Sequence, residues 1–276
     1  AALLGTSAAP PVAIAEAAAS MRIGTLPGAE AEVRPSVPFG PAVAGGIATA
    51  VLDLVGRQGG RPLVSLLGGD PAARIAVNGL VRADRPDRDG VVEEAAAQLR
   101  TGIRTLKLKA GDPADLEGAL RALRETFGSA LCLRVDWNGR FDPAEAATQL
   151  RRFEWADLEY VEDPIPGEHG PDAFARLRRA SAVPIAIDEP ITDLGAATEY
   201  LDAEAADVLI VKPARVGGPL AALRIVEAAT ARGVPVTIST LYETGIGLAA
   251  ALHVAATVPG DRPHGLATAD LLADDL

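Results

Sequence analysis

Short apolar runs alternate with longer stretches of helical spacing along most of the chain, from about Arg74 to the last residue. Each run has the length and the aliphatic or β-branched content of a strand, and the stretch to the next run suits one loop and one helix. The eight runs are Ile75–Val81, Thr105–Lys109, Leu131–Asp136, Leu158–Glu162, Ile185–Asp188, Val208–Lys212, Val236–Thr240 and Gly265–Leu271. The pattern predicts a series of strand–helix units.

The segments between the runs carry the signals of helix ends. Asp112-Pro113 and Asp142-Pro143 each match an N-cap residue followed by proline in the first helical turn. Gly102, Gly128 and Gly233 lie where the helices should stop. Eight units in series favour a closed (β/α)₈ barrel, a TIM-like α/β fold, over an open doubly wound sheet, which usually has about five or six strands. We predict this barrel over 73–276.

Residues 1–72 do not share the pattern. Ala42–Gln58 has the periodicity of an amphipathic helix, and Gly59-Gly60-Arg61-Pro62 ends it. We expect this part to form a partial N-terminal, α-helical capping segment that packs beside the mouth of the barrel. The first residues lack a basic stretch ahead of the apolar ones, so we expect no signal peptide.

Composition excludes several classes of partner. A net charge of −11 gives the chain no general attraction for nucleic acid or for an anionic membrane. The single cysteine, Cys132, excludes an internal disulfide and a Cys-rich zinc site, and it suits the reducing cytoplasm. No uncharged apolar run reaches the roughly 18 residues of a transmembrane helix. We expect a cytoplasmic protein, and nothing in the pattern favours a monomer over a homo-oligomer.

Charged residues stand at the carboxyl ends of five consecutive predicted strands. Parallel strands buried on both faces should be almost purely aliphatic. A single charge at a strand end is usually a solvated loop residue, but five strands break the rule at the same end. In a barrel these ends converge on one mouth, where active sites lie. The residues are Lys107, Lys109, Asp136, Glu162, Asp188 and Lys212.

The residue types suggest a metal-assisted proton abstraction. Asp136, Glu162 and Asp188 supply hard oxygen ligands without His or Cys, which favours Mg²⁺ over zinc. Such an ion can bind a substrate carboxylate and stabilise the negative charge formed when the neighbouring α-proton leaves. We predict that Lys109 is the base, with Lys107 beside it and Lys212 across the site. The predicted partner is a small carboxylate substrate.

These residues resemble the enolase superfamily, in its muconate-lactonizing subgroup. Lys107-Leu108-Lys109 matches the K-x-K of its second strand, the three carboxylates match its metal ligands, and Lys212 matches its sixth-strand lysine. Within the subgroup the resemblance is strongest to the o-succinylbenzoate synthases of menaquinone biosynthesis. The segments that carry it are Arg134–Gly139, Val161–Pro164, Ala186–Glu189, Ser239–Gly247 and Gly265–Ala269.

The resemblance implies a Mg²⁺-dependent syn-dehydration of 2-succinyl-6-hydroxy-2,4-cyclohexadiene-1-carboxylate. It implies that Lys109 removes the α-proton and then protonates the leaving hydroxyl, while Lys212 stabilises the anion. It also implies that Arg134 and Asn138 support the metal ligands. Glu189, next to Asp188, is a further supporting residue that could form a salt bridge with a lysine at the mouth. Members of the family begin with the strands of a capping domain, which we do not find before Ala1, and they continue past the eighth strand.

The predicted substrate-binding residues come from the last two units. Backbone amides near the helix that begins after the seventh strand can bind a carboxylate. Ser239 and Thr240 would add hydroxyl donors there, and Gly265 and Leu266 belong to the matching eighth-strand segment. Glu243 either faces the mouth or caps a helix.

Other functions are weighed against the dehydratase. A racemase or epimerase of N-acylamino acids or dipeptides would use the same two lysines as paired acid and base groups. A barrel remnant without activity is a third hypothesis, against which the complete set of ligands and lysines argues. The Gly245–Ala250 segment matches G-x-G-x-x-A, but no acidic strand end follows at the spacing of a dinucleotide site. We expect His169, His253 and His264 to be structural.

Overall fold

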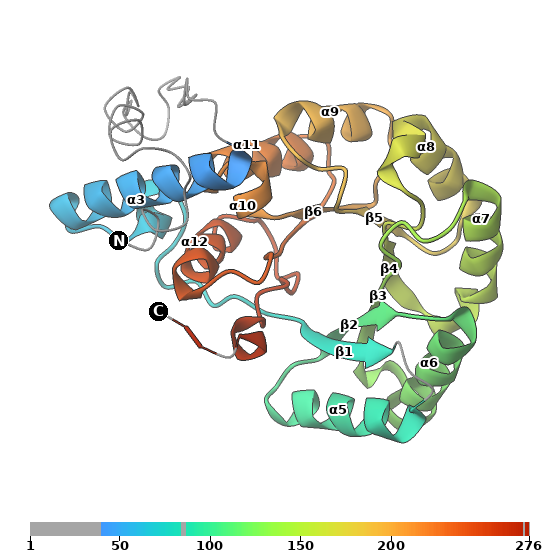
Figure 1. Ribbon diagram of the computed structural model, residues 1–276. Helices are drawn as coiled ribbons and strands as arrows, with labels where there is room; N and C mark the ends of the chain where they lie inside the picture. Colours follow the sequence, from blue (N-terminus) through green and yellow to red (C-terminus); the bar gives the residue numbers. More distant parts are fainter. Residues whose placement is uncertain (1–39, 84–86, 273, 276) are drawn as a thin grey trace.

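The computed structural model describes residues 40–83, 87–272, 274 and 275. Seven parallel strands form one sheet in which each strand pairs with the next along the chain. Figure 1 shows this sheet curled into a ring with helices outside it. The strands are β1 (Gly79–Ala83), β2 (Thr105–Ala110), β3 (Cys132–Asp136), β4 (Leu158–Glu162), β5 (Ile185–Ile187), β6 (Val208–Val211) and β7 (Val236–Ile238).

Helices connect successive strands, as the sequence predicts. They are α5 (Arg88–Arg100), α6 (Pro113–Phe127), α7 (Pro143–Arg152), α8 (Gly170–Ala180), α9 (Leu194–Asp202), α10 (Pro213–Val216), α11 (Pro219–Thr230) and α12 (Gly245–Ala255). Short 3₁₀ turns lie at Gly128–Ala130, Glu154–Ala156, Gly167–His169 and Ala269–Leu271. The carboxylates of Asp112 and Asp142 cap α6 and α7, and Gly128 ends α6 with positive φ. None of the described helices combines the length and apolar character of a membrane span.

The ring closes through two residues rather than through a full eighth strand. Val77 pairs with His264, and Ser239 pairs with Gly265, both in parallel. The Asn78 N–H donates to the His264 carbonyl at 2.9 Å, and the Gly265 N–H donates to the Ile238 carbonyl at 2.8 Å. The barrel architecture is therefore supported, but a strand over Gly265–Leu271 is wrong. After the bridge the chain turns, since the Thr268 hydroxyl bonds the Thr240 hydroxyl and a 3₁₀ turn follows.

The core has two parts. The larger one fills the space between the sheet and the surrounding helices. A smaller cluster of Tyr160, Ala186, Val208 and Ile210 lies inside the ring. The inner core is small because charged side chains occupy the rest of the barrel interior on β2 and β3.

The N-terminal helices pack against the outer layer of the barrel. The predicted helix Ala42–Gln58 is confirmed as α3 (Pro41–Gly59), and a short α4 (Leu63–Leu66) follows. Helix α3 lies beside α10 and α11 (Figure 1), with Gly45 against Gly218. A Cβ added to Gly218 would lie 2.8 Å from the Gly45 Cα, and one added to Gly45 would lie 3.1 Å from the Gly218 N, so the two backbones pack closely here. Residues 1–39 of the predicted capping segment lie outside the described residues.

Candidate active site

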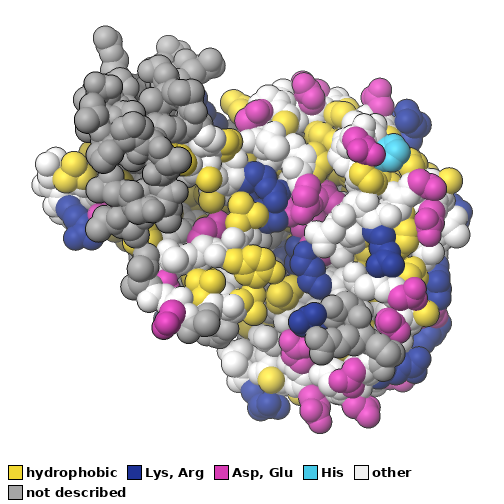
Figure 2. All heavy atoms as spheres, viewed as in Figure 1, with side chains coloured by type: hydrophobic (Ala, Val, Ile, Leu, Met, Phe, Trp, Pro, Cys, Tyr) yellow, Lys and Arg dark blue, Asp and Glu magenta, His cyan; other side chains and the backbone are white. Residues whose placement is uncertain are grey.

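Strand register brings the predicted site residues to one end of the sheet. Lys109 pairs with Asp136, and Asp136 pairs with Glu162, so these three lie side by side on β2, β3 and β4. Asp188 directly follows β5, and Lys212 directly follows β6. Figure 2 shows basic and acidic side chains gathered around the hollow in the middle of the ring.

Ion pairs join the lysines to the carboxylates. Lys107 Nζ lies 2.6 Å from Glu162 Oε1 and 2.8 Å from Asp136 Oδ2. Lys109 Nζ lies 2.6 Å from Asp136 Oδ2, and Lys212 Nζ contacts Asp188 Oδ2. These are the only three lysines in the sequence. Every lysine of the chain therefore lies in this cluster.

Burial and mutual charge perturb the cluster strongly. Burial raises the pKa of Glu162 well above its usual range. Lys107 lowers this pKa, but the carboxylates of Asp136 and Asp188 raise it further. Burial opposes ionisation of Asp136 too, but Lys107 and Lys109 outweigh it and lower the pKa of Asp136 to about 2. Burial alone would lower the pKa of Lys107, yet Glu162 and Asp136 raise it above its usual value.

The three carboxylates fit a divalent cation. Asp136, Glu162 and Asp188 are each about 1% exposed and bring only oxygen donors to one place. Burial, together with repulsion from Asp136 and Asp188, raises the pKa of Glu162, and a shared cation would relieve that repulsion.

Arg215 belongs to the site and was not predicted. It lies on α10, three residues after Lys212, and its Nη1 donates to Asp188 Oδ1 at 2.9 Å and to the Asp188 carbonyl at 3.2 Å. The charge pattern in the sequence marks the strand ends, and Arg215 lies one helical turn past the end of β6. Asp188 therefore accepts from two cations, Lys212 and Arg215.

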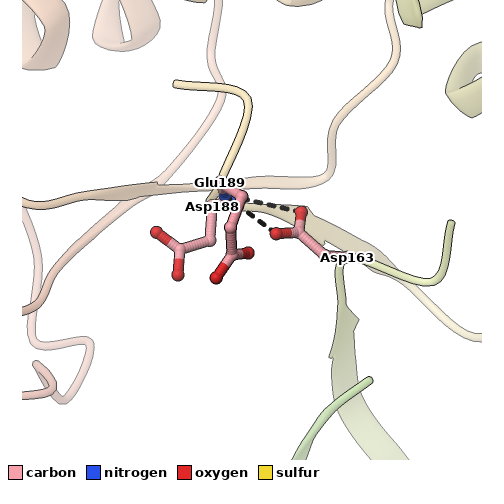
Figure 3. A group of neighbouring side chains, drawn as sticks. All are labelled: Asp163, Asp188 and Glu189. Carbon is pink, nitrogen blue, oxygen red and sulfur yellow. Dashed lines mark hydrogen bonds between the residues drawn. The ribbon is translucent and has the colours of Figure 1, made fainter. Parts of the chain in front are cut away.

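Asp163 was also missed, although it directly follows Glu162. It is 2% exposed, and both of its oxygens accept backbone N–H groups, from Asp188 at 2.9 Å and from Glu189 at 2.8 Å. Figure 3 shows this arrangement. One oxygen each of Asp163, Asp188 and Glu189 lies within 4.8 Å of the others. In the sequence, the signal that could have identified Asp163 is a second acid directly after the predicted ligand Glu162.

Asn138 links three of the predicted residues. Its Oδ1 accepts from Lys109 Nζ at 2.9 Å, its N–H donates to Asp136 Oδ1 at 3.0 Å, and its Nδ2 donates to Glu189 Oε1 at 3.4 Å. Glu189 is exposed and meets Asn138 rather than a lysine.

Arg134 lies elsewhere. Its guanidinium is fully buried and donates to Glu159, to the Asn78 side chain and to the Pro263 carbonyl. None of these described partners is a predicted metal ligand. The register shift between β3 and β4 explains why Arg134 contacts Glu159 instead of a metal ligand. The shift leaves Glu159 without a strand partner at a bulge, 2.7 Å from the Arg134 guanidinium. The resemblance implied that Arg134 supports the metal ligands, but its contacts are with Glu159, Asn78 and Pro263.

The predicted substrate-binding residues are only partly at the mouth. The Thr240 hydroxyl bonds Thr268 at 2.9 Å, and the Ser239 hydroxyl faces the Gly265 carbonyl at 3.5 Å. Leu266 is buried in the main core, so its side chain faces away from the mouth. The Gly245 N–H at the start of α12 donates to both oxygens of Asp275, which thus takes the place expected for a substrate carboxylate.

Glu243 and the histidines complete the sequence predictions. Glu243 accepts from the Leu241 N–H, and burial raises its pKa despite nearby Lys212, so it faces the site while bracing its own loop. His264 Nδ1 accepts from the Ile238 N–H, a structural role. His253 lies on α12, where burial lowers its pKa, and His169 is exposed in a loop.

Comparison with known proteins assigns the family. A family model described as Enolase C-terminal domain-like matches residues 90–275. The chain is similar to an o-succinylbenzoate synthase of Thermobifida fusca, with 36% identity over 73% of this chain and 62% of the relative. It is also similar to an N-succinylamino acid racemase of Thermus thermophilus, with 34% identity over 87% of this chain and 64% of the relative. The chain thus spans less than two thirds of the length of these relatives.

Solved structures agree. A muconate cycloisomerase from Pseudomonas fluorescens superposes with a TM-score of 0.79 at 30% identity, covering 87% of this chain and 67% of that one. A dipeptide epimerase from Enterococcus faecalis, complexed with Mg and the dipeptide L-Leu-L-Tyr, superposes with a TM-score of 0.76 at 27% identity, covering 84% and 65%. The chain belongs to the enolase superfamily, in its muconate-lactonizing subgroup.

Proposed function

We propose that the chain abstracts the proton next to a substrate carboxylate, and that its reaction is that of an o-succinylbenzoate synthase. One observation carries the proposal: lysines from β2 and β6 face a common cluster of three buried carboxylates from β3, β4 and β5. Strands β2 and β6 are four places apart in the ring, so Lys109 and Lys212 approach from opposite sides. Two relatives with 36% identity are named o-succinylbenzoate synthase.

The exposure of the lysines supports a division of roles between them. The Lys109 side chain is 36% exposed, against 13% for Lys107 and 9% for Lys212. Lys109 is therefore the lysine that a substrate reaches most easily, and its Nζ accepts the α-proton. The same Nζ then returns that proton to the leaving hydroxyl, which departs as water when the C–O bond breaks. Lys212 stabilises the negative charge from the other side.

Asp136, Glu162 and Asp188 would hold Mg²⁺. When bound, the cation supplies positive charge where the substrate carboxylate gains electron density. The epimerase structure with Mg supports this assignment, since it shares the fold. Asn138 orients Lys109 and Asp136 through two hydrogen bonds, and Arg215 orients Asp188.

A racemase of N-succinylamino acids is the second candidate. The relative of that name matches 87% of this chain, a larger share than the synthase from Thermobifida fusca. Lysines on opposite sides of an α-carbon suit this reaction, because one removes the proton and the other delivers a proton to the opposite face.

An assay in D₂O separates the two reactions. The chain, with Mg²⁺ and after EDTA treatment, is offered the cyclohexadiene substrate and an N-succinylamino acid. Release of o-succinylbenzoate in a metal-dependent manner supports the dehydratase. Deuterium at the α-carbon of both enantiomers of the N-succinylamino acid, without dehydration of the cyclohexadiene, would contradict the dehydratase and support the racemase.

Lys109→Ala should abolish turnover, because no other described base has comparable access to the mouth from this side. Mg²⁺ binding should survive, since no ligand is removed. Asp142→Ala at the start of α7 provides a control for modest loss of stability. Activity of Lys109→Ala within tenfold of the parent would remove Lys109 from the base role.

A further inference from the structure

Strand β5 stops before it reaches the site. It has three residues, and its pairing extends to Ala186 with β4 and to Ile187 with β6. Asp188 and Glu189 therefore lie past the last ladder pair. Asp188 is 1% exposed, so water does not satisfy its backbone N–H, and that group needs an acceptor from the protein.

Asp163 supplies this acceptor. One carboxylate oxygen takes the Asp188 N–H and the other takes the Glu189 N–H (Figure 3). A charged acceptor makes these bonds stronger than those of a neutral side chain. The bonded pair of amides replaces the missing ladder and holds the backbone from which the Asp188 side chain projects.

The backbone of Asp163 is itself fixed to β5 and to the turn that follows β3. Its N–H donates to the Ala186 carbonyl at 3.0 Å, and its carbonyl accepts from the Gly139 N–H at 2.8 Å. Its φ of 43° is in the left-handed region, which is uncommon for a residue other than Gly, Asn or Asp. Asp163 thus connects the carboxyl ends of three strands, each of which carries one predicted metal ligand.

We propose that Asp163 is a positioning residue that orients Asp188 for cation binding and for its contact with Lys212. The inference rests on the proposed function, because it assumes that Asp188 is a cation ligand. Asp163 acts through the backbone, because both of its oxygens accept the amide N–H groups of Asp188 and Glu189. Glu189, the third acid of the group, is exposed, and its backbone N–H is held by the same Asp163 carboxylate.

The test compares two carboxylates from neighbouring elements that hold opposite ends of β5. Asp207 holds the start of β5, where its Oδ2 accepts the Ile185 N–H at 2.8 Å, as Asp163 holds the end. Asp163→Asn keeps the left-handed backbone accessible but replaces one acceptor by a donor. Asp207→Asn is the matched control. Mn²⁺ serves as the probe, with binding measured by electron paramagnetic resonance of the free ion, and amide hydrogen exchange is followed in the cation-free protein.

We expect Asp163→Asn to weaken Mn²⁺ binding by about 10- to 100-fold, the usual effect of losing a residue that orients a ligand. Exchange at the amides of Asp188 and Glu189 should accelerate in the same variant. Asp207→Asn should bind Mn²⁺ within about twofold of the parent while exchange accelerates at Ile185. Asp163→Ser, which retains one acceptor oxygen, gives the same comparison if Asp163→Asn does not fold.

Three results from the variants would overturn the proposal. Binding within twofold of the parent in Asp163→Asn would show that the amide contacts do not matter for the ligand. An equal loss in both variants would assign the effect to general weakening of β5. Loss of Mn²⁺ with unchanged exchange at Asp188 would make Asp163 a ligand instead. A parent that binds Mn²⁺ without turnover would contradict the proposed function alone, and one that binds no Mn²⁺ would contradict both.

Discussion

The imidazole of His264 should make the protein sensitive to mild acid. His264 is one of the two residues that close the ring, and it is 4% exposed. Its Nδ1 accepts the Ile238 N–H at 2.9 Å, so the folded state requires an unprotonated Nδ1. Burial, together with the nearby charges of Arg134 and Arg262, lowers the pKa of His264 to about 4.

The size of the effect follows from the two pKa values. An unfolded histidine titrates near 6.5, so between about pH 6.5 and 4 the unfolded chain binds a proton that the folded chain does not. The free energy of unfolding must then fall as the pH falls through this window, and His264 contributes no pH dependence above it. A difference of about 2.5 pKa units corresponds to roughly 3 kcal/mol in full, of which about 2 kcal/mol is lost by pH 5.

Urea unfolding at about pH 7.5 and pH 5 measures this loss. His264→Asn removes the titration but keeps an oxygen that can accept from Ile238. Between the two pH values, the free energy of unfolding of the parent should fall by about 2 kcal/mol more than that of His264→Asn. This comparison cancels the contribution of the carboxylates, which the two proteins share. His169→Asn, at an exposed histidine, should lose as much as the parent. Equal losses in the parent and in His264→Asn would refute the reasoning.

Three further predictions concern stability. Arg134→Met should lower the free energy of unfolding by about 3 kcal/mol in urea titrations, because the Asn78 side chain and the Pro263 carbonyl lose their donor and Glu159 keeps only Arg262 as an ion-pair partner; a loss below about 1 kcal/mol would contradict this. Asp142→Ala should cost about 1 kcal/mol, since two N–H groups of α7 lose their cap, and a neutral result in the same assay would count against the cap. Mg²⁺ at about 100 times its Kd should stabilise the parent by about 2.7 kcal/mol, reversibly with EDTA. Asp188→Asn should abolish most of this gain in thermal melts, and an undiminished gain would remove Asp188 from the ligand set.

Strand order and the meeting of the charged strand ends were predictable, because both follow from local patterns. Each β-branched run lies one helix from the next, and alternation decides which face a residue occupies. The order of the strands then brings Lys109, Asp136 and Glu162 together without further information.

Other features depend on contacts that no local pattern encodes. The bulge at Glu159 redirects Arg134, and only the paired strands reveal it. Asp163 and Arg215 act through bonds to a residue on another element, 25 and 27 positions away. The eighth segment has strand-like composition, yet two residues suffice to close the ring, and the remaining ones turn away.

The confinement of lysine to the site gives the chain an internal reporter. All other basic side chains in the sequence are arginines or histidines. Reductive methylation with ¹³C-formaldehyde would therefore label Lys107, Lys109, Lys212 and the terminal amine alone. Their different exposures, 13%, 36% and 9%, imply different rates of labelling, with Lys109 first. The ionisation of the three lysines could thus be followed by NMR through a few resonances, with the terminal amine as the only labelled group outside the cluster.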